Sequence, residues 1–171
     1  MLFRSLSERA RATVSDVRRS VHALRPPALD ELGLVPALRE GAAQYGQNGL
    51  RVSVEAPESL PPLPAAVEVA AYRIAQEAMT NVVRHAGASS CSVRIALDEE
   101  AEEADVLHLE VEDDGRGVGE EPKAGVGTHS MRERAEELGG RCTIEALSLR
   151  GTLVSAQLPC WTARDTHHQE E

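Results

Sequence analysis

The sequence predicts an α+β two-layer sandwich, in which a mixed, mostly antiparallel sheet is covered by helices on one face. Segments with helical periodicity are interspersed with short segments in which apolar and polar residues alternate, the pattern of half-buried strands. Pairs of these short segments follow one another across polar connections, which favours antiparallel pairing. Because only 2% of the residues are aromatic, Ala, Val, Leu and Ile must form a core of closely packed helices and sheet.

The N-terminal part is expected to contain two helices and a strand. Residues 5–24 place apolar side chains three and four positions apart, which predicts an amphipathic helix that ends before Pro26. Its single apolar stripe requires a partner surface. After a turn at residues 30–33, a second helix is expected over 36–45, because its first residue is a proline, which a first helical turn tolerates. Residues 50–54 alternate as a strand.

The central part is expected to contain a long helix followed by two strands. The helix, over residues 65–85, follows a proline-rich connector. Strands are expected over 91–97 and 106–111, since apolar and polar residues alternate there. The acidic run between them, 98–105, is interpreted as an exposed hairpin loop rather than a metal site.

The C-terminal part is expected to contain a short helix and a β-hairpin. A glycine-rich loop over residues 115–128 precedes the helix, which a capping box formed by Ser130 and Glu133 is expected to open. Residues 141–146 and 152–158 alternate as the two strands of the hairpin.

Charge, cysteine content and hydropathy exclude several classes of protein. The net charge of −10 argues against direct binding of nucleic acid or of an anionic membrane. The three cysteines are widely separated, so neither a disulfide framework nor a zinc site is indicated, and a reducing cytoplasm is expected. No segment approaches the roughly 18 apolar residues of a membrane span, so we expect a chain without membrane contact, which can still belong to a membrane-bound parent.

A polar stripe on the long helix is the first candidate functional feature. Glu77, Asn81 and His85 are four residues apart and share one helix face, whereas the other side is apolar. Such a stripe can hold a metal ion and a phosphate. Magnesium takes oxygen ligands and keeps most of its water, so the side-chain carbonyl of Asn81 plus phosphate oxygens can suffice. Glu77 would order a water or accept a proton, and His85 would meet phosphate.

A second candidate feature follows the strand at 106–111. The carboxylate of Asp113 can accept a hydrogen bond from the amino group of an adenine, and Gly115 and Gly117 leave room for the base. Gly125 and Gly127 precede a helix start, where free N–H groups and the helix dipole favour phosphate. Together the two features predict a site for a nucleoside triphosphate. The sequence contains neither a Walker motif nor a complete GxGxxG, which argues against the P-loop and dinucleotide-binding classes.

In this order, the motifs resemble the ATP-binding catalytic domain of histidine kinases, within the wider family of gyrase-type and Hsp90-type ATPases that share the Bergerat-type fold. The resemblance covers about residues 34–159. The matching segments are 77–86 for the N box, 113–117 for the first glycine box, 125–131 for the second, and Gly151 with Thr152 for the last.

The resemblance implies ATP and Mg²⁺ as cofactors. It assigns the Mg²⁺ ligand to Asn81, adenine recognition to Asp113 and the catalytic, water-ordering role to Glu77. The other nucleotide-binding residues that it implies are His85, Gly115, Gly117, Gly125, Gly127, Thr128 and Thr152.

Residues 24–34 resemble the junction after the dimerisation helices in sensor kinases of the nitrate-sensor and desaturase-thermosensor type. The comparison implies a partial dimerisation helix and junction over 1–32, an ATP-binding catalytic domain over 33–160 and a polar tail over 161–171. It also implies a homodimer, or a heterodimer with a kinase, through the N-terminal helix. The implied partner is a DNA-binding response regulator.

The chain is not expected to contain the phosphoacceptor. In the family this histidine precedes an acidic residue, and an acidic residue follows none of the six histidines. His22 lies on the expected N-terminal helix but beside the junction, and we interpret it as a surface residue. The sequence therefore predicts the ATP-binding core of a sensor histidine kinase. The alternatives are an anti-sigma-factor serine kinase of the same fold, which the junction speaks against, and a non-catalytic dimerisation module that modulates a full-length kinase.

Overall fold

The computed structural model of the protein describes residues 25–46, 49–99, 104–117 and 126–160. The helix expected over 5–24 and the polar tail expected over 161–171 lie outside these residues. Within them, no helix combines the length and the apolar character that a membrane crossing requires.

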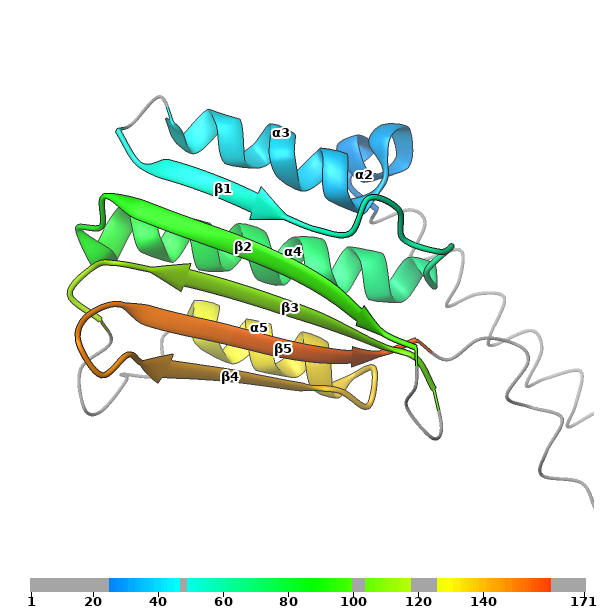
Figure 1. Ribbon diagram of the computed structural model, residues 1–171. Helices are drawn as coiled ribbons and strands as arrows, with labels where there is room; N and C mark the ends of the chain where they lie inside the picture. Colours follow the sequence, from blue (N-terminus) through cyan, green and yellow to red (C-terminus); the bar gives the residue numbers. More distant parts are fainter. Residues whose placement is uncertain (1–24, 47–48, 100–103, 118–125, 161–171) are drawn as a thin grey trace, which may run out of the picture.

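Five strands form one sheet with the order β1-β2-β3-β5-β4 (Figure 1). Strand β1 pairs parallel with β2, and the other three pairs are antiparallel. The predicted mixed, mostly antiparallel sheet is confirmed. The strands are β1 (Arg51–Glu55), β2 (Ser90–Asp98), β3 (Val106–Asp113), β4 (Arg141–Ala146) and β5 (Thr152–Pro159).

The helices cover one face of this sheet (Figure 1). Helix α3 packs beside β1, α4 contacts the central strand β3, and α5 contacts β4 and β5. The two-layer α+β class is therefore confirmed. The helices are α2 (Pro27–Leu32), α3 (Leu34–Gly46), α4 (Ala65–Asn81), the π-helical turn η1 (Val82–Ala86) and α5 (Val126–Glu136).

The turn expected at residues 30–33 is wrong, because a short helix, α2, lies there. Pro27 occupies the first helical position, where its missing N–H costs nothing. Gly33 ends the helix with a φ of 78° and donates its N–H to the carbonyl of Leu29 at 3.0 Å. Proline and glycine therefore delimit a helix here rather than a turn.

The capping box expected at Ser130 and Glu133 is also wrong. Helix α5 begins at Val126, so Ser130 lies within the helix rather than before its first turn. Glu133 instead pairs with His129, whose Nε2 lies 3.0 Å from Oε1 of the carboxylate. Residues four apart face each other on a helix, and this contact occupies the carboxylate that a capping box would need.

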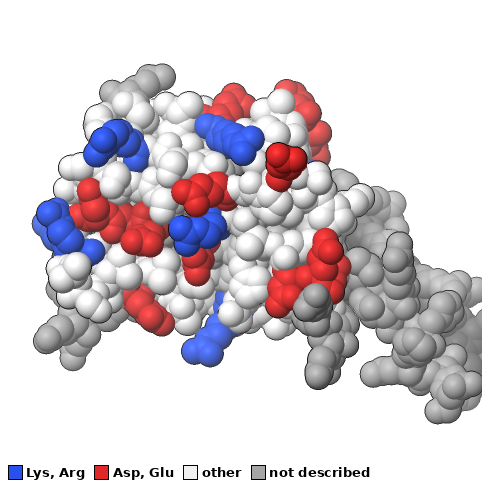
Figure 2. Space-filling model, viewed as in Figure 1, with Lys and Arg blue, Asp and Glu red and all other residues white. Residues whose placement is uncertain are grey.

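A single core lies between the sheet and the helices. On β3, Leu107, Leu109 and Val111 point into it and are buried. The opposite face of the sheet carries interspersed acidic and basic side chains (Figure 2). There the guanidinium of Arg94 on β2 forms ion pairs with two neighbouring strands. Its Nε lies 3.5 Å from Oε2 of Glu55 on β1, and its Nη1 lies 3.2 Å from Oε2 of Glu110 on β3. The strands thus follow the alternation that the sequence predicts for half-buried strands.

Arg25 attaches the first described residues to helix α4. Its Nη2 lies 2.7 Å from Oε2 of Glu68 in the first turn of α4, and it also donates to the carbonyl of Leu29 at 3.3 Å. Its Nε lies 2.6 Å from Asp30 Oδ1, an ion pair without hydrogen-bond alignment. The side chains of Arg25 and Glu68 are only 11% and 17% exposed, so little water screens this pair.

We expect Glu68→Ala to lower the free energy of unfolding by about 2 kcal/mol, because it leaves the nearly buried guanidinium of Arg25 with one acidic partner. Urea unfolding followed by circular dichroism measures the loss. The control is Glu110→Ala, which breaks an ion pair on the exposed sheet face, where solvent screens the charges, and should cost much less. Equal losses in the two variants would contradict this account of Arg25.

Candidate nucleotide-binding site

A cleft of about 790 Å³ lies between α4 with η1, the end of β3, the start of α5, and strands β4 and β5. Gly115 lies next to Asp113 but is not part of the lining, and Gly125 lies outside the described residues. The predicted site residues that line the cleft are Glu77, Asn81, His85, Asp113, Gly117, Gly127, Thr128 and Thr152.

Helix α4 presents its polar stripe to the cleft because its other side packs on the sheet. Ala71, Ile74 and Ala75 on that side are buried. The small alanine side chains let the helix approach the strands closely. Asn81 stays half-buried at the end of the helix, where its amide is accessible from the cleft.

The helix does not continue regularly to His85. Residues Val82–Ala86 form a π-helical turn, and Gly87, with a φ of 59°, ends it. A π turn is wider than an α turn and occurs frequently at functional sites. His85 and Arg84 from this turn line the cleft, whereas Val83 is exposed on the outside.

Asp113 ends β3 and is the one buried charged side chain among the described residues. Its Oδ1 accepts the N–H of Gly115 at 2.7 Å, which fixes the orientation of the carboxylate. Cys91 faces it from β2. Burial, together with the charges of Asp113 and Asp114, raises the pKa of the Cys91 thiol to about 12. The thiol is therefore neutral at physiological pH and adds no second charge beside Asp113.

Two glycines let the chain pass close to Asp113. Gly151 has a φ of 103°, and a Cβ there would overlap the carbonyl oxygen of Asp113. Gly117 has a φ of 78°, and a Cβ there would lie 2.9 Å from the carbonyl oxygen of Gly151. The hairpin before β5 and the loop after β3 can meet only because both positions lack a side chain.

Asp114 joins this loop to the start of β2. Its Oδ1 accepts the N–H groups of Ser89, at 2.7 Å, and Ser90, at 2.9 Å. The bonds from Ser90 and Ser89 stabilise the carboxylate and lower the pKa of Asp114 below its usual value. The loop after β3 is thus held to the start of β2 directly beside Asp113.

Sequence reasoning missed the apolar walls of the cleft and two of its polar residues. Arg84, three residues after Asn81, could have been found from helical spacing, and Ser130 lies in the expected second glycine box. The pattern of apolar residues along the sequence does not say which of them border a cleft. The apolar lining residues outside α4 and η1 are Val111, Met131, Ile144 and Val154.

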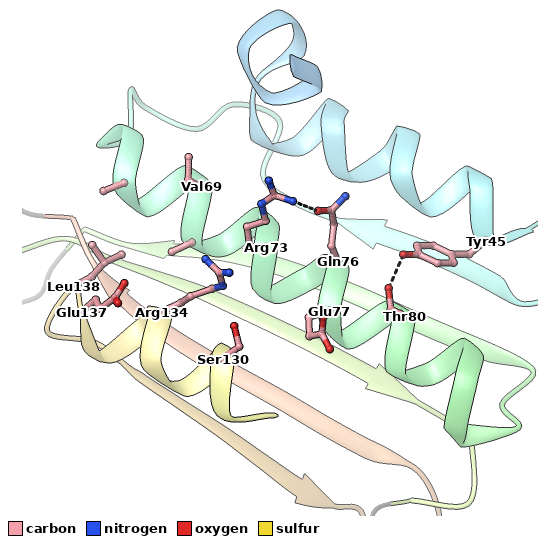
Figure 3. A pocket seen from close by; sticks show the side chains of 12 residues that line it. Tyr45, Val69, Arg73, Gln76, Glu77, Thr80, Ser130, Arg134, Glu137 and Leu138 are labelled. Atoms are coloured by element: carbon pink, nitrogen blue, oxygen red, sulfur yellow. Dashed lines mark hydrogen bonds between the residues drawn. The ribbon is translucent and has the colours of Figure 1, made fainter. Parts of the chain in front are cut away.

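A second hollow, of about 740 Å³, lies along the outer side of α4 between α3 and α5 (Figure 3). Tyr45 and Thr80 are hydrogen-bonded at 3.0 Å beside it, and Arg134 reaches it from α5. This hollow shares Glu77 and Ser130 with the cleft but contains neither Asn81 nor Asp113. Glu77 therefore lies where the two hollows meet, whereas Asn81, His85 and Asp113 line the cleft and not the second hollow.

Comparison with known proteins defines the class. Residues 66–162 match the model of the histidine kinase-, DNA gyrase B- and HSP90-like ATPase family. The chain belongs to this family.

Curated relatives narrow the comparison within that family. The chain is 33% identical to sensor histidine kinase MctS of Rhizobium johnstonii, over 96% of this chain and 36% of that protein. It is 35% identical to oxygen sensor histidine kinase NreB of Staphylococcus carnosus, over 85% of this chain and 42% of that protein. The chain thus spans roughly two fifths of the length of the relatives that it matches. The predicted similarity to sensor histidine kinases is confirmed.

A solved structure supports the fold. The histidine kinase domain of the blue-light activated histidine kinase of Erythrobacter litoralis EL346 superposes with a TM-score of 0.59 and 22% identity, over 75% of this chain and 59% of that one.

We expect Gly151→Ala to lower the free energy of unfolding by about 3 kcal/mol, because the new methyl group meets the backbone of Asp113 in a strained conformation. Gly139→Ala is the matched control, since Gly139 has a φ of 74° and nothing lies within 4 Å of the Cβ position. That change should cost about 1 kcal/mol through backbone strain alone. Chemical denaturation measures both, and equal losses would show that the contact with Asp113 has no consequence.

Proposed function

We propose that this chain binds Mg-ATP in the cleft and is the ATP-binding catalytic core of a two-component sensor histidine kinase. The observation that carries the proposal is that the amide of Asn81, at the end of α4, and the buried carboxylate of Asp113, at the end of β3, line one cleft. Family membership and the sensor histidine kinases among the relatives support it. They do not favour the serine-kinase and non-catalytic alternatives.

In this proposal the adenine binds at the Asp113 end. One oxygen of this buried carboxylate already accepts a hydrogen bond from the N–H of Gly115. The carboxylate is therefore well oriented to accept a hydrogen bond from the exocyclic amino group of adenine. The apolar side chains of Val111, Met131 and Ile144 line the same cleft and would pack on the base. The other nucleotide contacts that we propose are Gly115, Gly117, Gly125, Gly127, Thr128 and Thr152.

The triphosphate binds at the Asn81 end. The described residues contain no group of three or more acidic, histidine or cysteine side chains that could hold a metal by themselves. One amide oxygen plus phosphate oxygens is a donor set that suits Mg²⁺, which keeps several waters. We therefore assign the Mg²⁺ ligand to Asn81 and phosphate contacts to Arg84 and His85. Bound Mg²⁺ would neutralise charge on the phosphates.

Transfer moves the γ-phosphoryl group from ATP to an imidazole nitrogen of a histidine, so a P–N bond forms and the P–O bond to the β-phosphate breaks. The imidazole proton passes to a base, and ADP leaves. We assign the base, or the group that orders a water, to Glu77, which lines the cleft one turn before Asn81.

The phosphoacceptor histidine and the final acceptor lie outside this chain in the proposal. We propose that the segment before residue 33 pairs with the corresponding helices of a second kinase chain, as homodimer or heterodimer. A DNA-binding response regulator then receives the phosphoryl group. A cytoplasmic location agrees with three free, buried cysteines.

The test mixes the full chain with γ-labelled ATP, Mg²⁺ and a separate dimerisation segment that contains a histidine followed by an acidic residue. We expect label on that segment and none on the chain alone. Asn81→Ala should lower transfer about a hundredfold, because a metal ion contributes several kcal/mol to such reactions.

Gln76→Ala is the matched control, since it truncates an amide on the same helix that does not line the cleft. It should leave transfer unchanged. Label on His22 of the isolated chain, or transfer that is insensitive to Asn81→Ala, would contradict the proposal.

A further inference from the structure

The end of η1 is held by a residue from a distant part of the chain. The last four carbonyl groups of a helix lack partners within the helix. Arg116, in the loop after β3, provides partners for two of them. Its side-chain Nε–H donates to the carbonyl of His85 at 2.7 Å, and its backbone N–H donates to the carbonyl of Ala86 at 2.9 Å.

Gly115 makes this approach possible. A Cβ at Gly115 would lie 2.5 Å from the carbonyl oxygen and 2.6 Å from the Cβ of Ala86. The loop therefore lies directly against the end of η1, and Arg116 follows at the position from which it reaches His85. Arg116 is exposed and is not among the residues that line the cleft.

The two carbonyl groups belong to the side of the cleft assigned to the phosphates. The C-terminal end of a helix carries partial negative charge, which opposes a bound polyanion. Arg116 engages the carbonyl of His85 and fixes the peptide units of the turn from which Arg84 and His85 reach the cleft. A substitution of Arg116 should therefore weaken the binding of a ligand with phosphates more than the binding of one without them.

We propose that Arg116 is a positioning residue for the triphosphate end of the cleft. It acts through its hydrogen bond to the carbonyl of His85, which holds the π-helical turn so that Arg84 and His85 face the phosphates, and it does not contact the nucleotide. The inference rests on the proposed function, since it concerns the same cleft.

Two variants separate the hydrogen bond from the charge. In glutamine, Nε2 is the fourth side-chain atom, the position of Nε in arginine, so Arg116→Gln keeps an N–H donor there without the cation. Arg116→Met has a similar length and no donor. Isothermal titration of the full chain with Mg-ATP and, separately, with adenosine gives the four dissociation constants to compare with the wild-type chain.

We expect Arg116→Met to weaken Mg-ATP binding about tenfold, the effect of one typical hydrogen bond to a charged group, and to leave adenosine binding within about twofold. Arg116→Gln should restore Mg-ATP binding to within about threefold of the wild-type chain. Arg141→Met, on the edge strand β4 and outside the cleft, is the control and should change the dissociation constant of neither ligand.

Three results would overturn the inference. Equal weakening in the Gln and Met variants would mean that the charge of Arg116 acts, not its hydrogen bond. Equal weakening of ATP and adenosine would mean a general structural role, and unchanged binding in Arg116→Met would mean none. A wild-type chain that binds no Mg-ATP would contradict the proposed function itself, and the inference with it.

Discussion

The cleft depends on the hydrogen bonds that join the end of η1 and the start of β2 to the loop after β3. Asn81 and Asp113 belong to different elements, and no direct contact sets the distance between them. Hydrogen bonds to backbone groups hold the two elements in place: Arg116 donates to the carbonyls of His85 and Ala86, and the carboxylate of Asp114 accepts the amides at the start of β2. A site that must fit both ends of one nucleotide requires such a rigid connection.

The composition of the core also helps to place α4 and β3 relative to each other. With very few aromatic residues, helix α4 packs on the sheet through Ala71, Ala75 and Ala78, all of them buried. Small side chains bring the helix close to β3, so that residues on its edge share a cleft with the end of that strand. Cys91, the buried partner of Asp113 on β2, is a neutral thiol, since burial and the charges of Asp113 and Asp114 raise its pKa to about 12. Asp113 is thus the charged group buried at this end of the cleft.

The sequence was sufficient where local rules and tertiary packing agree. The alternation in β2 and β3 predicted both strands and the face that each buries. The four-residue spacing of Glu77 and Asn81 predicted that these two side chains share one side of α4, and both line the cleft. These patterns work because each periodicity follows from the regular backbone geometry of a helix or a strand.

The sequence was insufficient where distant contacts decide the structure. Nothing local in residues 82–86 indicates a π-helical turn, whose carbonyl partners come from Arg116. The spacing of Ser130 and Glu133 fits a capping box, but it fits the interior of α5 equally well. The carboxylate of Glu133 contacts His129 instead. The short helix α2 was missed because proline and glycine border turns and short helices alike. The apolar walls of the cleft follow from the way α5, β4 and β5 come together, which no local pattern encodes.

The most direct test is a crystal structure of the full chain with Mg²⁺ and a non-hydrolysable ATP analogue. We expect one nucleotide in the cleft, with the amino group of the adenine donating a hydrogen bond to the carboxylate of Asp113 and with Mg²⁺ held between the side chain of Asn81 and the phosphates. A nucleotide bound elsewhere, or one that contacts only one of these two residues, would contradict it.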